Sequence, residues 1–106
     1  MRRVIIESPY AGDVETHKTY SRRCIRDSLQ RGEAPIASHS LYTQPGILDD
    51  NIPEERELGI NAGHAWLDVA DAIIFYTDYG IGNGMKKVLA KLYLKIEERT
   101  IGKNPI

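Results

Sequence analysis

The chain has 106 residues, which suits one domain over residues 1–106 and leaves no room for two. Its 14 Lys and Arg residues balance 15 Asp and Glu residues, and this net charge of −1 argues against an electrostatic nucleic-acid binder. No apolar run approaches the roughly 18 residues that a membrane span needs. A single cysteine excludes an intramolecular disulfide and a thiolate metal cluster. These totals predict a cytoplasmic protein with no metal, cofactor, membrane partner or nucleic-acid partner.

Strands and helices alternate in the first third of the chain. The apolar run at 3–7 predicts a buried strand, and turn residues at 8–13 predict a loop after it. A helix capped by Asp13 or Thr16 is expected next. Its inward positions recur at helical spacing, and they are His17, Tyr20, Cys24, Ile25 and Leu29. A weaker strand over 34–38 should begin near Pro35, which cannot donate to a strand ladder.

The remaining elements follow a long polar stretch at 39–52, which predicts a loop. Pro53 is well placed in the first turn of a helix, whose apolar face comprises Leu58, Ala62, Ala65, Trp66 and Val69. The clearest strand is 72–76. A last helix is expected after residue 84 and extends to Arg99, with Met85, Val88, Leu89, Leu92 and Ile96 directed inward. The tail at 102–106 is either a final strand or irregular.

This order of elements implies parallel strands joined by right-handed crossovers. The predicted fold class is α/β, a Rossmann-like three-layer sandwich with a small parallel sheet in which 4–6 and 73–76 are adjacent at the centre. Ligands bind such sheets outside the carboxyl ends of the strands. Three loops converge there, at 7–13, 38–51 and 77–84, and the sequence therefore predicts a pocket at this edge.

A glycine loop, Gly80-x-Gly82-x-Gly84 with Asn83 inside it, follows the third strand and precedes the last predicted helix. Free amides at a helix start attract anions, so Gly80, Gly82, Asn83 and Gly84 are candidate ligand-binding residues. The spacing departs from the G-x-G-x-x-G dinucleotide fingerprint. An ordinary tight turn is the alternative.

Two carboxylates are candidate catalytic residues, since each follows a buried strand. Glu7 is either a solvated strand end or a pocket carboxylate whose burial raises its pKa and suits it to acid–base work. Asp78 follows the strongest strand. Nearby candidates for ligand binding are Ser8, Pro9, Tyr10 and His39, although a loop histidine is equally typical of a polar surface.

The first loop, Ser8-Pro9-Tyr10-Ala11-Gly12-Asp13, resembles the first-strand loop of nucleoside 2-deoxyribosyltransferase-like proteins. The similarity is closest to a short, uncharacterised branch common in phage and bacterial genomes. Further matches lie in 37–39, 41–44, 48–50, 53–56 and 76–81, at Asp71, and at Gly84-Met85. The resemblance covers nearly the whole chain to about Lys87.

The resemblance implies a Rossmann-like fold, a nucleoside or nucleotide pocket, and chemistry at an N-glycosidic bond. In that family a glutamate on the helix after the glycine loop attacks the anomeric carbon of the sugar. In the short branch it typically appears as Gly-Met-x-x-Glu, and here the aligned residue is Val88. A valine cannot form a covalent glycosyl intermediate. We therefore expect a pseudoenzyme that keeps the pocket and binds or sequesters a nucleoside- or nucleotide-type small molecule. An active N-glycoside hydrolase or deoxyribosyltransferase using Glu7 or Asp78, and an interaction module with a vestigial pocket, are the alternatives.

A homo-oligomer is also expected. Trp66 and Tyr93 lie on or near helical faces that a three-layer domain of this size leaves partly uncovered. Packing of both rings inside one domain is the alternative.

Overall fold

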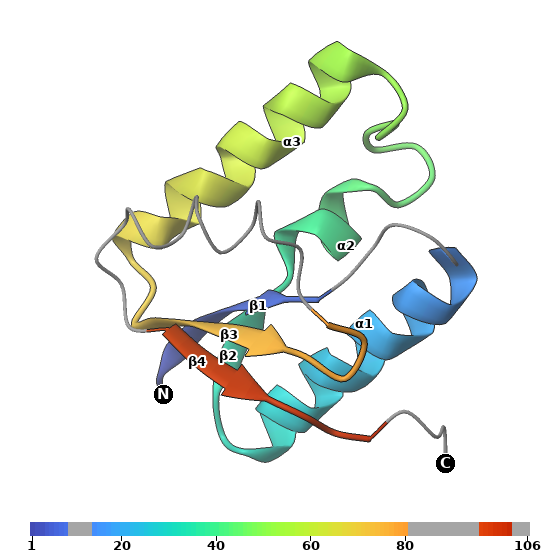
Figure 1. Cartoon of the computed structure of the whole chain (residues 1–106). Coiled ribbons are helices and arrows are strands. Elements are labelled where there is room, and N and C mark those ends of the chain that lie inside the picture. The colour runs from blue at the N-terminus through green and yellow to red at the C-terminus, as the bar shows by residue number, and fades with distance from the viewer. Residues whose placement is uncertain (9–13, 81–95, 103–106) are drawn as a thin grey trace.

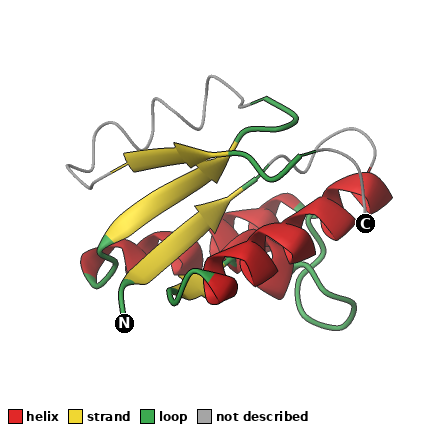
Figure 2. Ribbon diagram, turned by 90° about the horizontal axis from the view of Figure 1, so that it is seen from below, coloured by secondary structure: helices red, strands yellow, loops and turns green. Residues whose placement is uncertain are grey.

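The fold is known from a computed structural model that describes residues 1–8, 14–80 and 96–102 (Figure 1). Its strands are β1 (Arg3–Glu7), β2 (Ala34–Ile36), β3 (Ala72–Tyr76) and β4 (Ile96–Arg99). They form one sheet in the order β2-β1-β3-β4, and every pair is parallel. Figure 2 shows the strands running in one direction. The predicted α/β class with a small parallel sheet is confirmed, as is the central pairing of β1 with β3.

Helices lie on both sides of this sheet. They are α1 (Val14–Gln30), α2 (Ser38–Tyr42) and α3 (Pro53–Ala65), and a 3-10 turn, η1 (Trp66–Asp68), follows α3. Figure 1 shows α1 on one side of the sheet and α3 on the other. The helix predicted to begin at Pro53 is confirmed. None of the described helices is long and apolar enough to cross a membrane.

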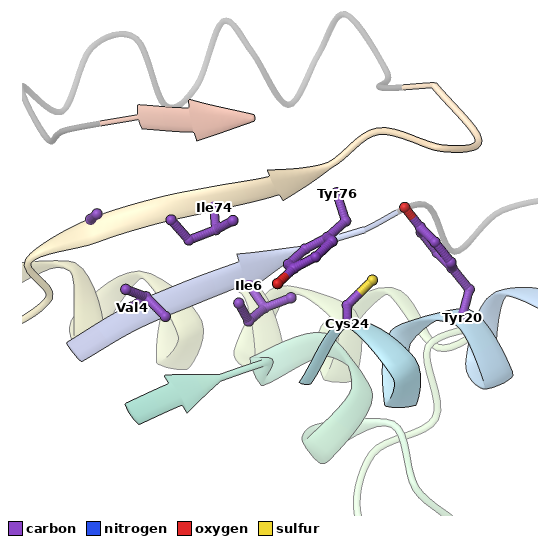
Figure 3. Packing of buried hydrophobic residues seen from close by; sticks show 7 residues of the cluster. Val4, Ile6, Tyr20, Cys24, Ile74 and Tyr76 are labelled. Carbon is purple, nitrogen blue, oxygen red and sulfur yellow. The ribbon is translucent and has the colours of Figure 1, made fainter. Parts of the chain in front are cut away.

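The core follows from the alternation of side chains along the two central strands. Val4 and Ile6 of β1 pack with Ile74 and Tyr76 of β3 against α1, which contributes Tyr20 and the predicted core residue Cys24 (Figure 3). The intervening residues face the other way, where Ile5, Ile73, Phe75 and Leu67 form a second cluster. All five residues of β3 are buried, as expected for a strand covered on both faces of a parallel sheet.

The prediction that the last helix extends to Arg99 is wrong for residues 96–99, which form β4. The fully buried strand β3 offers unpaired backbone groups along its open edge, and a strand satisfies them where a helix would not. The backbone N–H of Thr77, for example, donates to the carbonyl of Arg99 over 2.9 Å. The rest of that predicted helix, including Tyr93, and the tail at 103–106 lie outside the described residues.

Two predicted helix faces also differ from the structure. In α1 the buried positions are Tyr20, Ser21, Cys24 and Ser28, whereas Leu29 is 55% exposed. Small serines let α1 approach its neighbours closely and form hydrogen bonds there. In α3 no residue is buried. This helix packs closely against α2 at Gly63, where a Cβ would lie 2.6 Å from the Ser38 hydroxyl oxygen.

Candidate functional site

A small hollow of about 10 Å³ lies where the carboxyl end of β1 meets α1 and α2, a volume that accommodates about one water molecule. Its described lining residues are Ile6, Glu7, Ser8, Ser21, Ala37, His39 and Ser40. The chain passes from β1 to β2 on one side and later to β3 on the other, so β1 lies at the switch point of the sheet. Ligands bind beside such points in open α/β sheets. The structure thus brings together three predicted site residues, Glu7, Ser8 and His39.

Glu7 ends β1 opposite Phe75 of β3. Burial raises the pKa of the Glu7 carboxyl from its ordinary 4.5 to about 7, because an ionised carboxylate loses hydration when it leaves water. Neither Lys nor Arg is among the described lining residues. At neutral pH the side chain therefore holds comparable populations of acid and carboxylate.

His39 lies in α2, a short helix where the sequence predicted a loop. Its Nε2 atom lies 3.9 Å from a carboxylate oxygen of Asp50. Burial lowers the pKa of His39 and the nearby Arg56 adds to this, while Asp50 opposes it. The side chain is therefore mainly a neutral imidazole at pH 7, able to accept or donate one hydrogen bond.

Two serine hydroxyls in the hollow were not predicted as site residues. Ser21 of α1 and Ser40 of α2 lie 2.5 Å apart, oxygen to oxygen, and join the two helices by a hydrogen bond. The helical spacing of Ser21, Cys24 and Ser28 was a usable signal in the sequence. The hydropathy pattern favoured Leu29 as an inward residue instead. A serine in the local sequence gives no sign of burial when its hydrogen-bond partner lies on another helix.

Asp78 lies elsewhere, in the turn after β3. Its carboxylate accepts hydrogen bonds from the Tyr20 hydroxyl at 2.5 Å and from the backbone N–H groups of Ile101 and Gly102 at 2.9 and 2.7 Å. Burial alone would raise the pKa of Asp78, but these hydrogen bonds outweigh it and lower the pKa. The carboxylate thus ties β3 to α1 and to the segment after β4, which leaves it little capacity for chemistry.

Aromatic rings surround this turn. Tyr79 makes edge-to-face contacts with Tyr20 and His17, with ring centroids 4.8 and 5.6 Å away. Within the described part of the chain, the buried Nδ1 of His17 has no hydrogen-bond partner. Gly80 has a φ of +83° and its N–H donates to the Thr77 carbonyl over 2.9 Å. The glycine loop therefore begins as a turn that favours glycine.

Five candidate ligand-binding residues lie outside the described residues, and they are Pro9, Tyr10, Gly82, Asn83 and Gly84; Val88 lies outside them too. Among residues 1–8, 14–80 and 96–102, no group of three or more His, Cys, Asp and Glu side chains could hold a metal ion. The described site thus consists of one carboxyl, one imidazole and several hydroxyls, a set suited to hydrogen bonding and proton transfer.

Comparison with known proteins gives one family. No curated protein and no solved structure matches the chain. One family matches residues 2–98, a range that includes all four strands except the last residue of β4. The chain therefore belongs to the family described as Domain of unknown function (DUF7768).

Proposed function

We propose that this protein binds a nucleoside- or nucleotide-type small molecule at the carboxyl ends of its strands and does not carry out ordinary deoxyribosyl transfer. The observation that carries the proposal is the partly buried Glu7 carboxyl, with its raised pKa, at the switch point of the sheet beside His39. A buried ionisable group with a shifted pKa in a hollow is typical of functional sites. Polar groups of this kind orient ligands in otherwise apolar pockets.

The class of ligand comes from the resemblance to nucleoside 2-deoxyribosyltransferase-like proteins. Sugar hydroxyls and base edges offer both donors and acceptors, which complement a carboxyl that exists in both protonation states. The replacement of the family's nucleophile by Val88 supports binding without transfer. The site would then retain or sequester its ligand in the cytoplasm.

The first test is mass spectrometry of small molecules released from the purified protein, followed by calorimetry with a panel of nucleosides and nucleotides. We expect at least one of them to bind, and Glu7→Gln to weaken its binding tenfold or more. The matched control is Glu57→Gln, the same change at an exposed position of α3. If no nucleoside or nucleotide binds at millimolar concentration, the proposal is wrong and an interaction module with a vestigial pocket is favoured.

A second candidate function is N-glycoside hydrolysis with Glu7 as the reacting carboxyl. Its pKa of about 7 favours this reading, since general acid–base catalysis is most efficient when the pKa lies near the working pH. Asp78 is a weaker candidate because three donors already occupy its carboxylate. Release of free base by the wild type, abolished in Glu7→Gln and retained in Glu57→Gln, would replace the binding proposal with this one.

The same proposal includes self-association. We infer that the protein works as a homo-oligomer, because its apolar surface exceeds what the described helices cover: Leu58, Trp66 and Val69 are 59, 42 and 47% exposed. Light scattering on the purified protein tests this, and a strict monomer at every concentration would contradict it.

A further inference from the structure

The hollow at the carboxyl end of β1 is too small for a whole sugar ring or a phosphate group. Its volume of about 10 Å³ corresponds to the space that one water molecule occupies. Its mouth is open to solvent, since Glu7 is only partly buried and the side chain of His39 is 40% exposed. The hollow can therefore admit one small group of a ligand whose remaining atoms stay outside it.

The walls of the hollow are polar and come from three elements. Glu7 ends β1, Ser21 belongs to α1 and Ser40 belongs to α2. Ser21 is only 2% exposed, and its hydroxyl oxygen lies 2.5 Å from that of Ser40. A buried hydroxyl is costly unless it is hydrogen-bonded, and each member of this pair satisfies the other.

The serine pair retains capacity for further hydrogen bonds. A serine hydroxyl carries one hydrogen and two lone pairs. Only one of the two hydrogens can lie between the oxygens of Ser21 and Ser40, so the pair can still donate once and accept. A sugar hydroxyl complements this set because it also donates and accepts. The neighbouring Glu7 carboxyl, with a pKa of about 7, can take either part as well.

A phosphate group fits the same hollow poorly. Beyond its size, an ionised phosphate oxygen only accepts hydrogen bonds and carries negative charge, which the ionised form of Glu7 would repel. The size and the hydrogen-bonding capacity of the hollow thus favour the same occupant, a single uncharged hydroxyl.

We propose that this hollow is the subsite for one sugar hydroxyl of the ligand, and that Ser21 and Ser40 determine the specificity for it. The inference rests on the proposed function and deepens it, since it names the ligand group that is recognised at this site. A phosphate, where the ligand carries one, lies outside the hollow. A site built to hydrogen-bond a ligand hydroxyl discriminates strongly against the analogue that lacks it, because its own polar groups are then left without a partner.

The experiment is titration calorimetry with ribonucleosides, deoxyribonucleosides and their monophosphates. The probe that binds the wild type most tightly is the parent ligand, and it is compared with each analogue that lacks one further sugar hydroxyl. We expect one of these analogues to bind the wild type about tenfold or more weakly than the parent. In Ser21→Ala the parent should weaken towards the affinity of that analogue, while the analogue itself should bind as it does to the wild type. A merely structural role of Ser21 would weaken both ligands alike, so the selective loss identifies a contact.

The matched control is Ser28→Ala, the same change at another buried serine of α1. The Ser28 hydroxyl donates to Glu33 over 2.9 Å, and Ser28 does not line the hollow. This variant should keep the full difference between parent and analogue. Ser40→Ala should reproduce the selective loss, and it replaces Ser21→Ala if that variant lowers the circular dichroism signal of the folded protein.

Three results would overturn the inference while the proposed function stands. The first is a wild type that binds the parent and all its analogues equally. The second is a preference for the parent that persists in both Ser21→Ala and Ser40→Ala. The third is an equal weakening of parent and analogue in these variants. If none of the probes binds the wild type, the proposed function and this inference are both wrong, and the two kinds of failure are thus distinguishable.

Discussion

Glu33 and Glu7 are both carboxylates next to the central sheet. They differ in whether a described arginine or lysine lies beside them. Glu33 is 6% exposed, and each of its carboxylate oxygens accepts a hydrogen bond of 2.6 Å from one of the two terminal guanidinium nitrogens of Arg99. Arg2 and the Ser28 hydroxyl also donate to it, at 3.2 and 2.9 Å. Glu7 has no such cation among the described residues of its hollow.

The pKa values follow from this difference. Hydrogen bonds from Arg99, helped by Ser28 and Arg2 and opposed by burial, lower the pKa of Glu33 to about 2. Burial raises that of Glu7 to about 7. A carboxylate that is paired with cations, like Glu33, stabilises the packing of β4 against β1 and α1. A carboxylate that is desolvated with no cation among the described residues beside it, like Glu7, costs stability, and such a cost is typical of functional sites.

The largest expected effect on stability comes from breaking the ion pair between Glu33 and Arg99. Arg99→Met leaves Glu33 buried without its main partner, and we expect the free energy of unfolding to fall by about 3–5 kcal/mol. Urea denaturation at pH 7 measures this. Arg31→Met is the control, since Arg31 makes a comparable 2.8 Å contact with Asp27 but is half exposed. That change should cost about 0–1 kcal/mol, and equal losses in the two variants would contradict the assignment.

The free energy of unfolding, measured at acidic pH, is the next test of Glu33. Because its folded pKa lies below its ordinary value, its stabilising contribution is present above about pH 4.5 and is lost as the pH falls towards 2. The full contribution is about 3 kcal/mol, at about 1.36 kcal/mol per pKa unit. Urea titrations between pH 5 and 2 should show a steeper loss in the wild type than in Glu33→Gln. Parallel profiles would show that Glu33 is not specially stabilised.

The contribution of Glu7 to stability should depend on pH in the opposite sense. Its folded pKa is raised, so the acid form is favoured and stability is lost as the pH rises from about 4.5 through 7. We expect Glu7→Gln to be more stable than the wild type by about 2–3 kcal/mol at pH 8 and nearly equal to it at pH 4.5. Thermal denaturation at the two pH values checks this, with Glu57→Gln as the exposed control. A Glu7→Gln protein less stable than the wild type at pH 8 would show that the carboxylate has a stabilising partner.

The smallest effect concerns the turn after β3. Tyr20→Phe removes the hydroxyl that donates to the Asp78 carboxylate and accepts from the Asp78 N–H over 3.1 Å. We expect a loss of about 1–2 kcal/mol, the usual contribution of hydrogen bonds of which one partner is charged. Tyr42→Phe is the control, because its hydroxyl accepts a single exposed hydrogen bond. Ligand binding retained in Tyr20→Phe would agree with a structural role for Asp78.

The fold class could be predicted because it depends on local patterns. Short apolar runs at 3–7 and 72–76, separated by helical segments, specify buried parallel strands whatever their exact neighbours are. The placement of Glu7 at the end of a buried strand was likewise visible in the sequence. Two of its partners in the hollow, Ser8 and His39, were also predicted.

Contacts between distant segments were decided by the tertiary structure. Whether Ile96–Arg99 continues a helix or becomes β4 depends on the open edge of β3 and on the pairing of Arg99 with Glu33, 66 residues away. The burial of Ser21 depends in the same way on Ser40 of another helix. The sequence by itself determined the first three strands, their order along the chain and the carboxyl at the switch point, because hydropathy and turn residues act locally. The tertiary structure alone decided which charges are paired, since an ion pair or a buried hydroxyl is stable only when its partner arrives from elsewhere in the chain.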